Sequence, residues 1–126
     1  MKYYRLHIDS KNDYLVYNKI TEILNVKPTV FDNEKDIYSI WTYAFDEEYE
    51  APNYDFINQF LNIIEPHFIE LQNIGINKQD ILIWLNYEYD QQCAMEFHPE
   101  EMKRLGESGI VMNIDCFQIK HKKKSK

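Results

Sequence analysis

Two histidine–glutamate pairs are the residues of this sequence best spaced to do chemistry. His67 and Glu70 lie three positions apart, and so do His98 and Glu101. On a helix such residues share a face, so an imidazole and a carboxylate can hold a divalent metal together. Neither pair has a third ligand nearby in sequence, and the helices that carry them are predicted to be short or interrupted. We therefore interpret all four residues as structural and predict no metal and no cofactor.

Serine and cysteine residues lack the contexts of a catalytic nucleophile. The three serines in question, Ser10, Ser39 and Ser108, have no glycine-elbow sequence around them, and the chain has neither a GxGxxG motif nor a P-loop. Cys93 and Cys116 lie 23 positions apart, without a CxxC spacing, in segments predicted as strands. Packed, unreactive thiols are therefore predicted, in a reduced protein. No catalytic residue is assigned, and an enzyme is the less favoured hypothesis.

Tyrosine and acidic residues concentrate in two segments, 43–54 and 87–90, within a chain that has ten tyrosines. Tyrosine supplies contact area and a hydroxyl group at low entropic cost, so tyrosine beside acid is typical of a protein-binding surface. The alternative is that the tyrosines cover sheet edges and the acids only keep the surface solvated. The candidate binding residues are Tyr43, Asp46, Glu47, Glu48, Tyr49, Glu50, Tyr54, Tyr87, Glu88, Tyr89 and Asp90.

Charge is distributed unevenly along the 126 residues. The net charge is −7, but residues 120–126 hold five lysines and no acid, so residues 1–119 hold 9 basic and 21 acidic side chains, a net of −12. Nucleic-acid binding is excluded as a main function, because phosphate contacts need lysine and arginine. A negative field of this size favours a basic protein partner. The short basic tail is predicted to be disordered.

Hydrophobic periodicity predicts one α+β domain over residues 1–119. Alternating side chains predict strands at 3–9, 37–45, 81–88, 93–97 and 110–119. Helical spacing predicts helices at 14–24, at 53–75 with an interruption at Pro66 and an end at Gly75, and at 99–105. The order β-α-β-α-β-β-α-β, with 81–88 and 93–97 as a hairpin, indicates a mainly antiparallel sheet with helices on one face. A ferredoxin-like arrangement of split β-α-β units is the expected form.

Residues 96–117 resemble a bacterial family in which a strand is followed by a short Pro-Glu helix containing Leu-Gly, then by Gly-Ile and an Ile-Asp-aromatic strand. The N-terminal part fits as well, with Ile-Leu-Asn-Val-Lys-Pro-Thr at 23–29 and a tryptophan strand at 40–42. The family is catalogued as domain of unknown function 4279. The resemblance covers nearly the whole chain and implies a small stand-alone α+β protein, with no catalytic residues to carry over.

These patterns together predict a cytoplasmic bacterial protein that acts by binding. The favoured hypothesis is an immunity- or inhibitor-like module that covers a basic surface of a protein partner. The alternative is a small-molecule-binding domain or small enzyme with its site between sheet and helices, around His67, Trp84 or His98. A homo-oligomer paired through an exposed strand edge is a third hypothesis. No membrane partner is expected, because the longest apolar run, 81–85, is far too short to span a bilayer.

Overall fold

The computed structural model describes residues 1–31, 34–45 and 55–119. The elements in chain order are β1 (Lys2–Asp9), α1 (Tyr14–Leu24), β2 (Ile40–Ala44), α2 (Phe56–Ile64), the 3₁₀ turn η1 (Glu65–His67), α3 (Phe68–Asn73), the 3₁₀ turn η2 (Lys78–Asp80), β3 (Ile81–Tyr89), α4 (Pro99–Ser108) and β4 (Val111–Gln118). The basic tail, 120–126, lies outside the described residues. Within them, no helix combines the length and the apolar character needed to cross a lipid bilayer.

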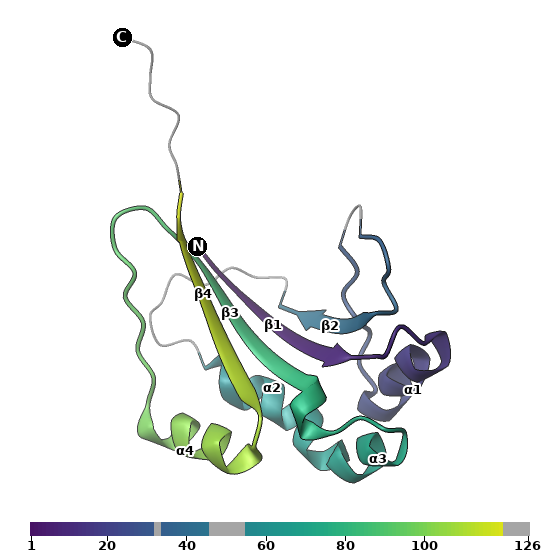
Figure 1. The fold of residues 1–126 in the computed structure, drawn as a ribbon. Helices are drawn as coiled ribbons and strands as arrows, with labels where there is room; N and C mark the ends of the chain where they lie inside the picture. The colour runs from purple at the N-terminus through teal and green to yellow at the C-terminus, as the bar shows by residue number, and fades with distance from the viewer. Residues whose placement is uncertain (32–33, 46–54, 120–126) are drawn as a thin grey trace.

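The four strands form one mixed sheet in the order β2-β1-β3-β4 (Figure 1). β1 is antiparallel to both β2 and β3, whereas β3 is parallel to β4. A parallel pair needs a crossover connection, and α4 supplies it between β3 and β4. The predicted α+β class is therefore confirmed, with helices gathered on one side of the sheet as Figure 1 shows.

The core lies between the sheet and these helices. Along β1 the buried side chains alternate with half-buried ones, as predicted, so that Tyr4, Leu6 and Ile8 face the helices. Ile20 of α1 and Phe60 of α2 are fully buried against this face. Burial of large apolar side chains of this kind contributes roughly 1.5–3 kcal/mol each to the free energy of unfolding.

Two helix boundaries follow the sequence signals closely. Pro66 lies in the first turn of η1, so the predicted 53–75 segment is divided into α2, η1 and α3 rather than forming one straight helix. Gly75 adopts φ +87°, a left-handed conformation that glycine reaches without steric cost, and its N–H donates to the Gln72 carbonyl. The predicted interruption and the predicted glycine end are both confirmed.

The predicted strand at 93–97 is wrong. These residues have no regular secondary structure, and β3 pairs with β4 instead of forming a hairpin with them. Met95 and Phe97 pack against the core, and the Phe97 ring lies 6.3 Å from the Phe56 ring. The apolar side chains that alternate at 93–97 therefore pack on the core without pairing as a strand. β3 pairs with β4 over eight register pairs, a longer ladder than residues 93–97 could form. Because β3 and β4 are direct neighbours, the ferredoxin-like split order is matched only loosely.

β4 is an edge strand with exposed apolar side chains. Val111, Ile114 and Phe117 are exposed, and the sheet places no further strand beyond β4 among the described residues. Unpaired backbone groups of an edge strand are able to pair with another chain. Self-association through this edge stays a prediction.

Candidate functional site

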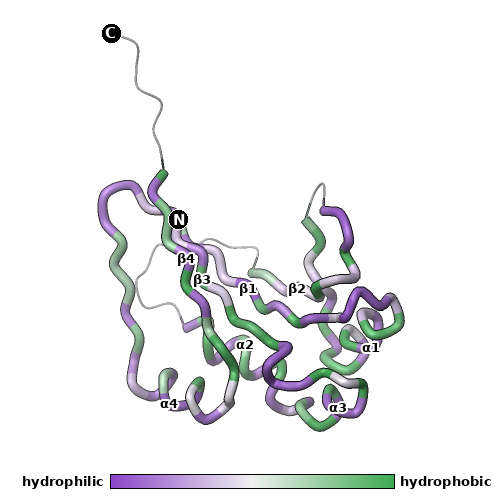
Figure 2. The backbone as a smooth tube through the Cα atoms, in the orientation of Figure 1, coloured by the Kyte–Doolittle hydropathy of each residue, from purple (hydrophilic) through white to green (hydrophobic). Residues whose placement is uncertain are grey.

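One face of the sheet is turned away from the helices (Figure 1). Its side chains come from the alternate positions of each strand, and the register sets Arg5 of β1 opposite Trp84 of β3 and His7 opposite Leu82. In Figure 2, polar and apolar residues alternate along β1, while β3 is hydrophobic in its first half and hydrophilic in its last half. We refer to this side of the sheet as the open face.

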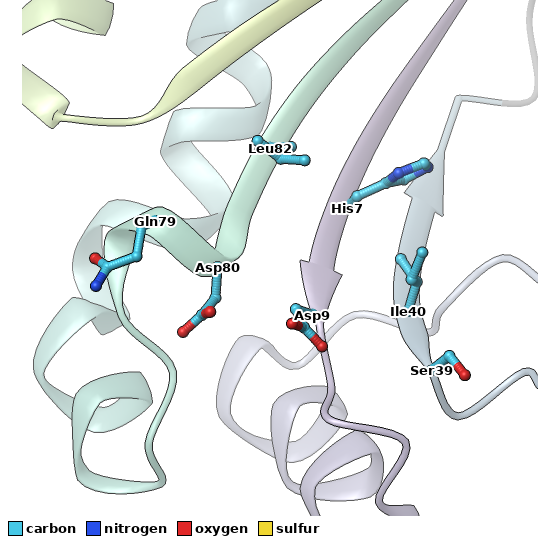
Figure 3. Close-up of a pocket in the computed structure, with 7 residues that line it drawn as sticks. All are labelled: His7, Asp9, Ser39, Ile40, Gln79, Asp80 and Leu82. Carbon is cyan, nitrogen blue, oxygen red and sulfur yellow. The ribbon is translucent and has the colours of Figure 1, made fainter.

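A hollow of about 440 Å³ lies at one end of the open face, a size within the usual range of ligand sites. It forms where β1 ends, β2 begins and η2 leads into β3 (Figure 3). Ile40 and Leu82 give it an apolar portion, and polar side chains complete the lining. The lining residues are His7, Asp9, Ser39, Ile40, Gln79, Asp80 and Leu82.

Two carboxylates of the hollow share one ammonium group. Lys11 Nζ lies 2.7 Å from Asp80 Oδ1 and 3.5 Å from Asp9 Oδ2. The backbone N–H of Asn77 donates to the other oxygen of Asp80 at 2.8 Å. Burial pushes the pKa of Asp80 upward, but the hydrogen bonds from Lys11 and Asn77 and the charge of Lys11 outweigh it and hold that pKa below its ordinary value. The Asp80 carboxylate is therefore ionised at neutral pH. Counted as formal charges, two aspartates and one lysine give this group of three a net charge of about −1.

His7 is the titratable base of the hollow. Burial lowers its pKa first, and the charge of Arg5 lowers it further, against an opposing effect of Glu34. A pKa below the ordinary 6.5 leaves the His7 ring neutral at pH 7, able to donate one hydrogen bond and accept another. The ring lies 6.1 Å from the ring of Trp84. The Trp84 indole N–H is buried and has no hydrogen-bond partner among the described residues.

The predicted binding residues at 87–90 lie at the far end of β3 from the hollow and make contacts within the chain. The Tyr87 ring lies 4.7 Å from Lys2 Nζ and 6.5 Å from the Tyr89 ring. The carbonyl of Glu88 accepts from the N-terminal ammonium, and its carboxylate accepts from the Tyr3 hydroxyl at 3.5 Å. Tyr87, Glu88 and Tyr89 therefore make contacts typical of side chains at the end of a strand, and a role of these residues in binding stays a prediction.

The other predicted segment, 43–54, is described only at its start. The Tyr43 ring packs edge-on against Phe45 at 5.9 Å and against Phe60 at 6.4 Å, so it contributes to the core. β1 lies between β2 and β3, so the sheet keeps Tyr43 and Tyr87 apart. The remaining candidates lie outside the described residues; they are Asp46, Glu47, Glu48, Tyr49, Glu50 and Tyr54.

The two histidine–glutamate pairs differ in their contacts. His67 Nδ1 and Glu70 Oε1 lie 2.8 Å apart. The backbone N–H of His98 donates to Glu101 Oε1 at 2.7 Å, which caps the start of α4, and its ring turns to Glu96 at 2.8 Å. In the part of the chain that the structure describes, no three His, Cys, Asp or Glu side chains gather in a way that could hold a metal ion.

Glu101 also takes part in a carboxyl pair with Asp55. Glu101 is buried, and its pKa is raised first by burial and then by the hydrogen bond and charge of Asp55, against the His98 hydrogen bond. Asp55 shows the reverse balance. Burial raises its pKa, but hydrogen bonds from Asn58 and Glu101 and the charge of Arg104 lower it overall. The pair therefore holds one proton, which stays on the Glu101 carboxyl group and is donated in a hydrogen bond to the ionised Asp55 carboxylate.

The two cysteines are close together, and the prediction of packed thiols is wrong for one of them. Cys93 Sγ lies 3.3 Å from Cys116 Sγ. Cys116 is exposed on β4, and Cys93 is half-buried in the connection between β3 and α4. Cys116 is exposed because it lies on the edge strand β4, whose side chains are mostly exposed. Cys93 comes close to it because residues 93–97 form a connecting segment and not a strand.

Sequence reasoning missed the hollow, although one signal for it was present. The alternation in β1 placed Arg5 and His7 on the face away from Leu6. The approach of Asp9 to Asp80 had no local signal, because it depends on which strands become neighbours. The hollow also lies on the open face and not between sheet and helices, where the alternative hypothesis expected a site.

No family model matches this chain, and the comparisons with curated proteins and with solved structures find no match either. The resemblance of residues 96–117 to domain of unknown function 4279 stays a prediction. The function of this chain is therefore inferred from the chain's own residues.

Proposed function

We propose that this protein is a binding module whose hollow takes a lysine or arginine side chain of a basic protein partner. The observation that supports this most is the arrangement of Asp9 and Asp80, two carboxylates that share the single ammonium of Lys11 beside an apolar surface. Lys11 balances one of the two negative charges, so the cationic head of a partner's lysine or arginine would balance the other. In the immunity- or inhibitor-like hypothesis, the hollow would be the contact with a basic side chain of the partner. The proposal includes a cytoplasmic location for both proteins.

The lining of the hollow suits the two parts of a basic side chain. Lysine and arginine carry an apolar stem and a charged head, and the stem gains by packing on apolar surface. In this proposal the stem lies on Ile40 and Leu82, and the head pairs with Asp80 and Asp9. Neutral His7 adds an acceptor for an N–H of the head without adding repulsion. An arginine head gains most, because its planar group binds carboxylates through two parallel hydrogen bonds.

The overall charge supports the same partner. A net of −12 over residues 1–119 attracts a basic surface at long range and speeds its association. Glu88 and Asp90 are far from the hollow along β3, so in this proposal they act through the field rather than through contact. Binding driven in this way weakens as salt rises, because the Debye length falls to about 8 Å at physiological ionic strength.

A peptide titration tests the proposal. The probe is a short capped peptide with one arginine between glycines, and binding is measured by calorimetry at low and at high salt. Wild-type protein is expected to bind it, with a Kd that rises with salt. Asp80→Asn keeps the oxygen that accepts from the Asn77 N–H but removes the charge, and is expected to weaken binding about tenfold or more.

Asp115→Asn is the matched control, because Asp115 is an exposed aspartate on the edge strand β4, opposite Asn86 of β3 and outside the lining of the hollow. It should change the Kd less than about twofold, as long-range effects of one exposed charge are small. Equal binding by wild type and Asp80→Asn would refute the proposed site. A pull-down from the native host with both proteins as bait then identifies the partner as the protein that Asp80→Asn fails to retain.

A small-molecule ligand is the second candidate function. The volume of the hollow, about 440 Å³, and its mixture of apolar and hydrogen-bonding groups favour it. Melting-temperature measurements with metabolite mixtures test it, because a ligand that binds the folded state raises apparent stability by mass action. A shift produced by an uncharged or acidic metabolite, and lost in Asp80→Asn, would favour this candidate over a basic partner.

A further inference from the structure

Cys93 and Cys116 form a dithiol that the proposed function does not use. Their sulfur atoms lie 3.3 Å apart at the edge of the sheet, where Cys116 is in register with Tyr87 near the end of β3. We propose that a peroxide oxidises this pair to an intramolecular disulfide, which locks the connection between β3 and α4 onto β4.

The geometry needs only a small movement. A disulfide bond is about 2.0 Å long, so the sulfur atoms must approach by roughly 1.3 Å. Cys116 is held in β4 by pairing with β3, whereas Cys93 lies in a segment without regular secondary structure. The movement therefore falls to Cys93.

Two hydrogen bonds hold the start of this connection beside β4. The Ile119 N–H donates to the Tyr89 carbonyl at 2.8 Å, and the Gln118 side chain donates to the Asp90 carbonyl at 3.0 Å. They keep Cys93 near its partner before oxidation, which raises the effective concentration of one thiol at the other.

The chemistry balances with hydrogen peroxide as oxidant. One thiolate attacks the peroxide, which forms a sulfur–oxygen bond, breaks the oxygen–oxygen bond and releases hydroxide. The second thiolate attacks the resulting sulfenic acid, which forms the sulfur–sulfur bond and releases a second hydroxide. The two thiols lose two electrons and two protons, and peroxide becomes two waters.

The environment of Cys116 favours slow oxidation over thiol catalysis. Although Cys116 is exposed as a residue, partial desolvation of its thiol raises the thiol pKa. The hydrogen bond and charge of Cys93 and the charge of Asp115 act in the same direction. A raised pKa keeps this thiol protonated at neutral pH, whereas catalytic thiols have lowered pKa values. The disulfide would close a ring from 93 to 116 that contains α4.

Oxidation of the full-length protein tests the inference. The protein is treated with hydrogen peroxide, remaining thiols are alkylated, and the products are analysed by non-reducing peptide mapping and thermal melting. One disulfide within each chain is expected, joining the peptides that contain Cys93 and Cys116. The melting temperature should rise by roughly 5–15 °C, because the cross-link restricts the unfolded chain, and a thiol reductant should reverse the rise.

Cys93→Ser and Cys116→Ser are the matched controls, and each should show neither the cross-link nor the rise. Disulfides between chains, oxidised thiols without a cross-link, or an equal rise in Cys93→Ser would each overturn the inference. Arginine-peptide binding should be the same before and after oxidation, because the hollow lies at the opposite end of β3. The two proposals can therefore fail independently.

Discussion

Lys11 Nζ lies 2.7 Å from Asp80 Oδ1, so the turn after β1 is joined to the turn before β3 across 69 positions of the chain. Lys11 reaches this place from a left-handed backbone conformation, φ +60°, which is uncommon for a residue with a side chain. The ion pair therefore fixes one wall of the hollow and also neutralises part of its charge.

Lys11→Gln should increase the affinity of the hollow for a basic ligand. Removal of the ammonium leaves Asp9 and Asp80 without their counter-charge, so the Kd of the arginine peptide is expected to fall about three- to tenfold. Stability should fall by less than about 1 kcal/mol, because Lys11 is largely exposed. Calorimetry and urea unfolding measure the two effects, with exposed Lys19→Gln as control. Weaker peptide binding by Lys11→Gln would contradict the expected role of Lys11 as a competitor.

The same variant should raise the pKa of Asp80. The hydrogen bond and charge of Lys11 hold that pKa low, and without them burial acts in the opposite direction. Carbon-detected NMR titration of the Asp80 carboxyl follows the change directly. This measurement is independent of any ligand, and an unchanged Asp80 titration would show that the ion pair does not persist in solution.

His7 and His98 should titrate in a fixed order. Burial lowers the pKa of His7, whereas the hydrogen bond that the His98 ring donates to the Glu96 carboxylate raises the pKa of His98. Histidine NMR signals should therefore show His7 changing below pH 6.5 and His98 above it. Because the folded-state pKa of His7 is lowered, its contribution to stability is present above pH 6.5 and is lost as pH falls. His7→Gln should reduce that acid-side loss, and a reversed order of titration would argue against a buried His7.

Wild-type protein should lose stability as pH rises, because Glu101 is buried and must give up its proton, and Glu101→Gln should remove this loss. The raised pKa of Glu101 means that the folded chain keeps a proton that the unfolded chain releases near pH 4.5. That contribution to the free energy of unfolding is complete below pH 4.5 and disappears as pH rises through the folded-state pKa. Glutamine can still accept from the His98 N–H and can donate to Asp55, so the variant should gain relative to wild type between pH 4 and pH 7, by about 1 kcal/mol.

Urea unfolding at a series of pH values measures this difference. The control is Glu100→Gln, because Glu100 is an exposed neighbour at the start of the same helix. The difference in free energy of unfolding between Glu100→Gln and wild type should not show the gain between pH 4 and pH 7 that is expected for Glu101→Gln. A constant difference between Glu101→Gln and wild type would show that Asp55 and Glu101 do not share a proton.

Thr21→Val should destabilise the fold through Trp41. The buried Trp41 indole N–H donates to Thr21 Oγ1 at 3.0 Å, and valine matches threonine in shape but offers no acceptor. An unsatisfied buried N–H costs about 1–3 kcal/mol, which is the expected fall in the free energy of unfolding. Thr21→Ser keeps the hydroxyl and should recover most of this loss. If valine and serine have equal effects, the hydrogen bond contributes little.

Much of the local structure could be predicted from the sequence. Pro66 and Gly75 marked the break and the end of the second helical segment, and Pro99 marked the start of α4. Each of these signals acts within a few residues of itself, through a missing N–H or an allowed left-handed φ. For the same reason the alternation of β1 correctly separated its buried face from its open face.

The partners of these segments were decided by tertiary structure. The pattern at 93–97 suits a strand, but β3 pairs with β4, and Phe97 packs on Phe56 instead. Strand choice depends on the competing ladders and on total apolar burial, which no short window contains.

The two candidate sites depend on the same long-range choice. Asp9 and Asp80 meet because β1 pairs with β3, and Cys93 and Cys116 meet because β4 takes the edge. The sequence by itself therefore determined most of the elements, the helix ends marked by Pro66, Gly75 and Pro99, and the buried face of β1, because these follow from spacing along one segment. Only the tertiary structure decided which charges and thiols lie together, because those contacts join residues 23 to 71 positions apart.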